Sequence, residues 1–94
     1  MTYRAEIFVT LKPVVNDPEG ITIHRGLQSL GFDSVQEVRS GKYLVLTLHA
    51  ADEPRARALV EAMAGDLLAN SVIEDYRVAI AAVAEPAGFR EVRG

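Results

Sequence analysis

Cysteine and tryptophan are absent from this 94-residue chain, and three tyrosines and three phenylalanines are its only aromatic residues. Without cysteine there is no disulfide framework, no thiol nucleophile and no cysteine metal site. No apolar run approaches the ~18 residues that a membrane span needs. The N-terminal stretch MTYRAEIFV lacks the apolar core and cleavage site of a secretory signal. We therefore expect a cytoplasmic protein with no membrane segment.

Positive charge is also scarce. The formal net charge is −3, and lysine and arginine are scattered singly along the chain. Binding of nucleic acid depends on many cations that neutralise phosphates, so this class of partner is not expected. Hydrophobic residues make up 49% of the chain, which is typical of a folded domain rather than a disordered one. A chain this short buries only about 60–65% of its unfolded surface, so its own core is small.

Alternation and capping signals predict six elements. Residues Tyr3–Leu11 alternate as a strand that stops at Lys12-Pro13. Asp17-Pro18 is typical of a helix start, and Gly31 supplies the left-handed residue that ends this helix. Beyond it we expect a strand over 35–39, a tight turn at Ser40-Gly41, a strand over 42–49, a helix between Asp52 and a left-handed Asn70, and a strand over 73–83. The second helix carries a predicted apolar stripe formed by Ala56, Leu59, Val60, Met63 and Leu67.

The predicted order of elements is β-α-β-β-α-β. It favours an α+β fold, the ferredoxin-like two-layer sandwich, with a four-stranded antiparallel sheet and two helices on one face. Residues 1–83 form the expected single domain, and the charged, aperiodic segment 84–94 is expected to be a flexible tail. The uncovered face of the sheet would be an apolar patch, which a second copy of the chain is the simplest way to cover. The residues expected to mediate this self-association are Phe8, Thr10, Tyr43 and Val45.

Catalytic and metal-binding patterns are weak. Glu74 and Asp75 are adjacent in an extended segment, so they point to opposite faces and cannot share a substrate. Nothing in their spacing brings His24 and His49 together, and a zinc site needs at least three ligands. The loop KPVVNDPEG has a single glycine, after its proline, whereas phosphate binding favours a glycine-rich loop. We expect no catalytic residue, metal site or cofactor on this chain.

Several short strings occur in order along the chain: VTLKP followed by DPEG, then LGF, VRSGKY and LLANSVIEDYRV. Together they resemble the PurS family, the small subunits of formylglycinamidine ribonucleotide synthase in the purine pathway. The resemblance covers about residues 3–83. It implies a chain without catalytic residues that forms dimers or tetramers and is part of an ATP-dependent amidoligase complex.

The resemblance also implies the partners. The family subunit joins a large synthetase subunit, which uses ATP and Mg²⁺, and a glutaminase subunit, which releases ammonia from glutamine. It bridges the two and supports ammonia transfer for conversion of formylglycinamide ribonucleotide to its amidine. The positions that match the family's motifs are the candidates for partner contact: Lys12, Pro13, Asp17, Arg39, Lys42, Asn70, Glu74, Asp75 and Tyr76.

Two other functions share this predicted topology. A ligand-sensing regulatory domain would bind a small metabolite at a dimer interface, and the loop Lys12–Gly20 would serve, although it lacks a cluster of glycines. A small acyl-phosphate hydrolase would need an arginine in a glycine-rich loop and an asparagine that positions water. The loop offers Lys12 and Asn16 instead.

Overall fold

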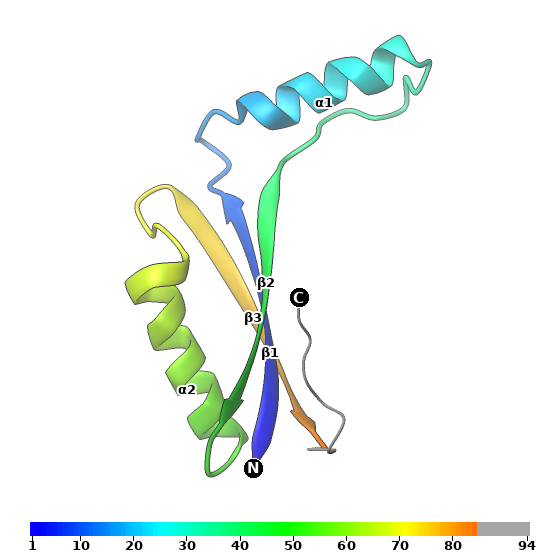
Figure 1. Ribbon diagram of the computed structural model, residues 1–94. Helices are drawn as coiled ribbons and strands as arrows, with labels where there is room; N and C mark the ends of the chain where they lie inside the picture. The colour runs from blue at the N-terminus through cyan, green and yellow to red at the C-terminus, as the bar shows by residue number, and fades with distance from the viewer. Residues whose placement is uncertain (85–94) are drawn as a thin grey trace.

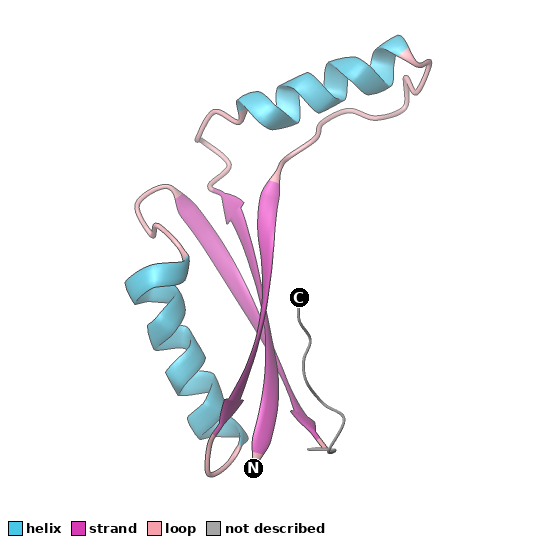
Figure 2. Cartoon of the chain, in the orientation of Figure 1, coloured by secondary structure: helices cyan, strands magenta, loops and turns pink. Residues whose placement is uncertain are grey.

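The computed structural model describes residues 1–84, which form a sheet, a helix packed on it and a second helix that stands off it (Figures 1 and 2). The prediction of a tail at 84–94 therefore lies almost wholly outside the described residues. In chain order the elements are β1 (Thr2–Leu11), α1 (Pro18–Ser29), β2 (Gly41–His49), α2 (Glu53–Met63), a π-helical turn η1 (Ala64–Leu68) and β3 (Glu74–Val83).

The sheet is antiparallel, and β1 is its central strand in the order β2-β1-β3. Ile7 lies opposite Leu44 of β2 and Val78 of β3. Because successive side chains of a strand point to opposite faces, these residues define the inner face, which α2 covers. Phe8 and the residues opposite it define the outer face.

The core lies between the inner face and α2. Its sheet side consists of buried residues of β1: Tyr3, Ala5, Ile7 and Val9. Its helix side consists of Ala56 and Val60, with Ala64 one turn further on. The predicted apolar stripe is therefore only partly correct, because Leu59, Met63 and Leu67 are exposed.

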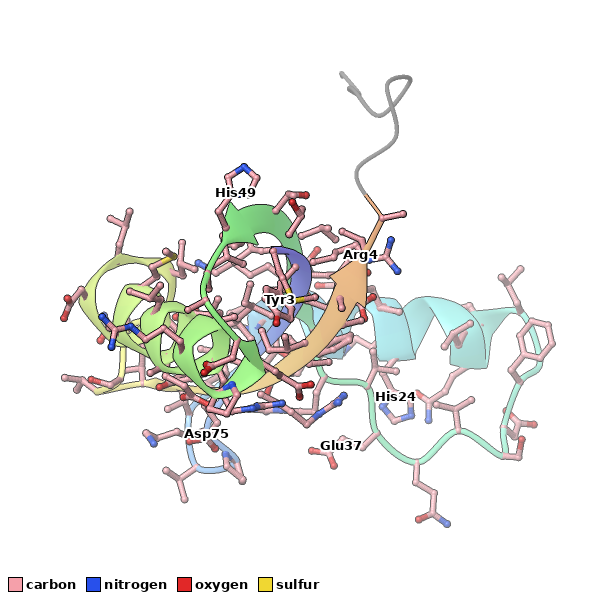
Figure 3. The ribbon with its side chains drawn as sticks, turned by 90° about the horizontal axis from the view of Figure 1, so that it is seen from below. Tyr3, Arg4, His24, Glu37, His49 and Asp75 are labelled. Carbon is pink, nitrogen blue, oxygen red and sulfur yellow. The ribbon has the colours of Figure 1, made fainter. Side chains whose placement is uncertain are left out.

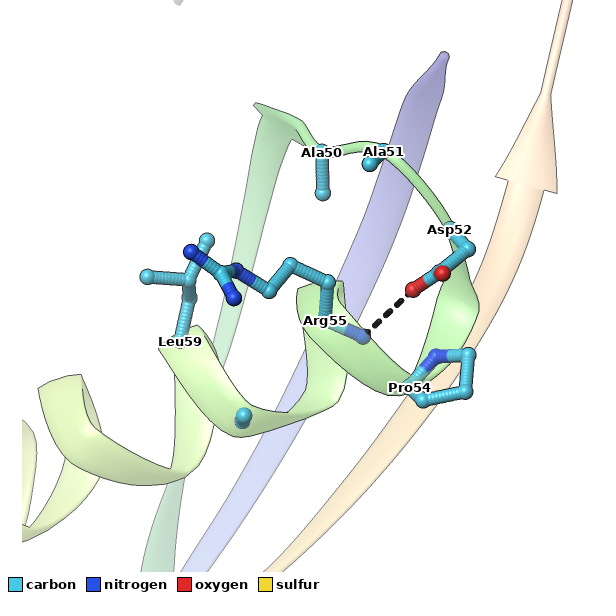
Figure 4. Close-up of a pocket in the computed structure, with 7 residues that line it drawn as sticks. Ala50, Ala51, Asp52, Pro54, Arg55 and Leu59 are labelled. Carbon is cyan, nitrogen blue, oxygen red and sulfur yellow. Dashed lines mark hydrogen bonds between the residues drawn. The ribbon is translucent and has the colours of Figure 1, made fainter.

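The predicted helix starts are confirmed. The Asp17 side chain accepts the backbone N–H of Gly20 at 2.9 Å, and that of Asp52 accepts the N–H of Arg55 at 2.9 Å (Figure 4). Gly31 has the predicted positive φ, +95°, just after α1. The prediction for Asn70 is wrong, because no non-glycine residue in the described chain has a positive φ. The helix instead widens into η1, and the N–H of Ala69 bonds to the carbonyl of Ala64.

The predicted fourth strand and hairpin are wrong. Residues 35–39 have no regular secondary structure and run back beside α1, which carries His24 (Figure 3). The His24 Nε2 donates to the Val35 carbonyl at 2.7 Å. Because this segment is tied to the helix, it does not pair with β2. Ser40 and Gly41 lead directly into β2 rather than forming a hairpin turn. The sheet of the described chain has three strands.

The sequence also predicted that both helices cover one face of the sheet, and this part of the prediction is wrong. α2 lies along the sheet, whereas α1 leaves the end of the sheet and points away from α2 (Figure 1). We call α1 and the returning segment 30–40 the arm. The β2 side of the inner face is left without the helix that a ferredoxin-like sandwich would place there.

Candidate functional site

Three segments that are far apart in sequence meet where the arm joins the sheet. Thr10 of β1 lies opposite Gly41 of β2 and Asp75 of β3, so the loop after β1 and the starts of both neighbouring strands lie together. We call this region the joint. It gathers most of the predicted partner-contact residues: Lys12, Pro13, Asp17, Arg39, Lys42, Glu74 and Asp75.

Asp17 is the central residue of the joint and is only 3% exposed. One carboxylate oxygen accepts the Gly20 N–H that begins α1, and the other accepts the Ser40 N–H at 2.6 Å, just before β2. The hydrogen bond from Ser40, then that from Gly20, and the nearby Arg39 charge lower the pKa of this carboxyl below its ordinary value of 3.8, against the opposing effect of burial. Asp17 therefore stays ionised and ties the beginning of the arm to its end.

Arg39 closes the loop that precedes α1. Its guanidinium donates to the carbonyl of Lys12 at 3.0 Å and to the carbonyl of Val15 at 2.9 Å. The sequence offered no folding role for this arginine, because its partners are main-chain groups 27 and 24 residues away. The structure shows that Arg39 fixes the loop conformation.

Gly20 allows the two sides of the joint to come together. A Cβ atom at this position would lie 2.2 Å from the carbonyl oxygen of Val38, which is too close for any side chain. Beside it, the Ser40 hydroxyl donates to the Glu19 carboxylate at 2.6 Å. Close backbone packing and this hydrogen bond therefore hold α1 and the returning segment together at the base of the arm.

Lys12 connects the loop to β3. Its ammonium group pairs with the Asp75 carboxylate at 2.7 Å, with the two side chains 34% and 56% exposed. Its backbone N–H also donates to the carbonyl of Ile73 at 2.8 Å. Because both side chains are partly exposed, a partner can reach these two charges. An exposed ion pair of this kind contributes little to stability.

The last predicted motif builds the turn into β3. The Asn70 N–H donates to the Glu74 carboxylate at 2.6 Å, and the Asn70 carbonyl accepts the Glu74 N–H at 2.7 Å. The Asn70 side chain accepts the N–H of Val72 at 3.1 Å. Tyr76 reaches the Glu61 carbonyl of α2 at 3.5 Å. These residues shape the turn, whereas Pro13 and Lys42 are exposed at the joint.

The outer face brings together the residues predicted to mediate self-association. The Phe8 and Tyr43 rings lie 5.1 Å apart, and Thr10 and Val45 are exposed on the same face. The Arg77 guanidinium lies 4.2 Å from the centre of the Phe8 ring. Sequence reasoning missed this contact, because placing Arg77 beside Phe8 requires the register of β3.

The outer face also carries a charged residue, Glu6. Tyr43 donates a hydrogen bond to the carboxylate of Glu6, and this bond raises the pKa of the tyrosine. Strand alternation already places Glu6 on the face that carries Phe8. The outer face therefore carries the charges of Glu6 and Arg77 beside its two aromatic rings.

The two histidines lie in different parts of the structure. His24 is on the arm, and His49 Nδ1 lies 3.1 Å from Thr2 Oγ1 at the opposite end of the sheet from the joint. Within residues 1–84, no three histidine or acidic side chains are grouped as a metal site would require. No helix in that range is both long and apolar enough to cross a membrane.

Comparisons with known proteins identify the family. The family model of PurS, phosphoribosylformylglycinamidine (FGAM) synthase, matches residues 4–82. A PurS subunit of this synthase from Synechocystis sp. is 49% identical over 82 residues, which are 87% of this chain and 82% of that subunit. The structure of PurS from Bacillus subtilis has a TM-score of 0.75 at 41% identity and matches over 85% of this chain and 99% of its own.

A chain in the structure of PurLQS from Thermotoga maritima has a TM-score of 0.80 at 31% identity. The match covers 86% of this chain and 99% of that one. Sequence and structure agree over nearly the whole described range. The chain therefore belongs to the PurS family of subunits of FGAM synthase, a ligase of purine biosynthesis.

Proposed function

We propose that this subunit is a non-catalytic bridge between the synthetase and glutaminase subunits of FGAM synthase and supports the passage of ammonia between them. The observation that carries this proposal is the joint, where the matching motifs from three distant segments form one surface. The complex named PurLQS contains a chain of the same fold together with other subunits, which supports the proposal. We place this function in the cytoplasm.

The reaction requires two chemistries that this chain need not perform. Glutamine is hydrolysed to release ammonia, and the amide of formylglycinamide ribonucleotide is activated with ATP before nitrogen replaces its oxygen. We assign ATP and Mg²⁺ to the synthetase subunit and glutamine hydrolysis to the glutaminase. The chain described here would contribute contact surface that keeps the two subunits in register, so that ammonia is consumed where it is released.

The residues of the joint divide into two roles in this proposal. Asp17 and Arg39 hold the loop and the arm in place through bonds to the main chain. Pro13 and Lys42 are exposed, and the charges of Lys12 and Asp75 are accessible. We propose that the exposed set touches the partner subunits and that the internal set shapes the surface they meet.

We further propose that copies of the chain associate with one another. The outer face with Phe8, Thr10, Tyr43 and Val45 is one surface for this contact. Tyr43 and Val45 each expose about half of their area, 55% and 51%. A dimer or tetramer would present more than one joint to the complex.

Co-elution tests the bridging proposal. The chain is mixed with its synthetase and glutaminase subunits and run on a sizing column, with and without Lys42→Glu. The expected result is one complex that Lys42→Glu weakens, while Arg55→Glu, at the other end of the sheet, does not. A chain that elutes alone under all conditions would contradict the proposal. Stabilisation of that chain by free amino acids would instead favour the ligand-sensing function.

A further inference from the structure

Two short turns at the joint each present a valine to solvent. Val14, in the loop after β1, is 93% exposed, and Val72, in the turn before β3, is 80% exposed. Turns are usually built from glycine, proline, asparagine, aspartate and serine. Neither valine belongs to the core of the described chain, so both apolar side chains are available to another molecule.

The loop that carries Val14 is fixed by bonds on both sides of it. The Val15 N–H donates to the carbonyl of Lys12 at 2.9 Å and closes the turn. Arg39 donates to the carbonyls of Lys12 and Val15 at 3.0 and 2.9 Å. Pro13, directly before Val14, has a restricted backbone φ angle. The backbone at Val14 therefore has its conformation before any partner binds.

The turn that carries Val72 is fixed in the same way. The Val72 N–H donates to the side chain of Asn70 at 3.1 Å, and the N–H groups of Ile73 and Glu74 both donate to the Asn70 carbonyl. The Glu74 carboxylate in return accepts the N–H of Asn70 at 2.6 Å. A surface that is ordered in advance loses little conformational entropy on binding. Both valines are therefore suited to a role in binding.

The two turns are joined to each other. The Lys12 N–H donates to the carbonyl of Ile73 at 2.8 Å, and the Lys12 ammonium pairs with Asp75 at 2.7 Å. Figure 1 shows the loop after β1 and the turn before β3 next to each other, at the end of the sheet from which α1 leaves. We call Val14, Val72 and the ion pair of Lys12 and Asp75 the tip surface.

The tip surface indicates the chemistry of its partner. Apolar side chains that enter pockets near the centre of an interface provide most of its binding energy. Charges beside them contribute mainly to orientation and to the choice of partner. A partner that fits therefore has apolar recesses for the two valines, with charges of both signs next to them for Lys12 and Asp75.

The chemistry of the reaction favours the synthetase subunit as this partner. Ammonia that is released before the synthetase is in place would be lost to solvent, so a bridge has to hold the synthetase throughout the cycle. The contact with the glutaminase can be shorter-lived. Permanent interfaces are more apolar than transient ones, and the tip surface presents two exposed valines.

We infer that Val14 and Val72 are the apolar anchors by which this chain holds the synthetase subunit of FGAM synthase. The ion pair of Lys12 and Asp75 lies beside these anchors and sets the orientation of the two proteins. This inference rests on the bridging function proposed above, and it names the surface and the partner of one of the two contacts.

Photochemical cross-linking tests the assignment in the assembled complex. The chain has no cysteine, so a single introduced cysteine can carry a benzophenone probe at a chosen position. Val14→Cys and Val72→Cys are labelled, mixed with the synthetase and the glutaminase, and irradiated. Both should cross-link to the synthetase. Ala51→Cys, exposed at the opposite end of the sheet, is the matched control and should not.

Cross-links from the two valine positions to the glutaminase or to a second copy of the chain would overturn the inference, as would their absence. Assembly of the labelled complex is followed on a sizing column. If the complex forms and the tip positions do not cross-link to the synthetase, only this inference fails. If the unsubstituted chain forms no complex, the bridging function fails with it.

Affinity measurements give a second readout. Val14→Asp and Val72→Asp should each weaken binding to the synthetase by at least about tenfold in titration calorimetry, because a carboxylate would have to enter an apolar recess. Ala51→Asp adds the same charge at the other end of the sheet and should leave the affinity unchanged. Circular dichroism should show that all three variants are folded, since all three positions are exposed. Unchanged affinity of both valine variants would overturn the inference.

Discussion

Asp17 and Ser40 are joined by a hydrogen bond of 2.6 Å between a buried carboxylate and a backbone N–H 23 residues later. The bond links the residue that begins α1 to the residue that precedes β2. It therefore closes the base of the arm.

Asp17→Asn should remove this link and keep the helix cap. Asparagine has one acceptor oxygen, which can bond the Gly20 N–H but leaves that of Ser40 unpaired. We expect the melting temperature to fall by roughly 4–8 °C, the shift for a domain of this size when such a bond is lost. Asp52→Asn is the matched control, because the structure gives Asp52 a single helix-cap bond, to Arg55. Equal shifts for both variants would show that the Ser40 bond has no particular role.

The contribution of Asp17 should depend on pH in one direction. Its pKa is lowered in the folded chain, so its stabilising effect is complete above the ordinary value of 3.8 and is lost as the pH falls below that value. The difference in melting temperature between the unsubstituted chain and Asp17→Asn should be constant from pH 7 to 5. It should shrink as the medium is made more acidic. A difference that grows below pH 4 would contradict the assigned ionisation.

Arg39→Met should loosen the loop after β1. The substitution keeps the apolar part of the side chain but removes the guanidinium donor, so the Val15 carbonyl loses this partner and the Lys12 carbonyl keeps only the Val15 N–H. We expect the free energy of unfolding to fall by about 1–3 kcal/mol. Hydrogen exchange should speed up at the Val15 amide, which bonds the Lys12 carbonyl. Exchange that is unchanged at this amide would show that Arg39 does not hold the loop.

Local signals in the sequence predicted local structure well. Asp17-Pro18, Gly31 and Asp52 lie at the helix boundaries where capping chemistry places them. The fourth strand was wrong because an extended segment can bond either to a sheet edge or to a helix. The bond from His24 to Val35, which decides between them, leaves no trace in the pattern of residues.

The site was predicted less completely than the elements. The matching motifs identified residues that the structure brings to one end of the sheet, but not what each of them does there. Arg39 bonds main-chain carbonyls, and any residue type provides those. The partner contacts themselves remain predictions. The departure of α1 from the sheet was not visible either, because the apolar pattern of a helix does not show which surface the helix packs against.

The central claim is that this chain couples release of ammonia to its use, and a reconstituted reaction tests it most directly. The synthetase, the glutaminase, ATP, formylglycinamide ribonucleotide and either glutamine or ammonia are combined, with and without the chain, and formation of the amidine is measured. The account predicts that product from glutamine requires the chain, whereas product from added ammonia depends on it much less. Equal rates with and without the chain from glutamine would contradict the account.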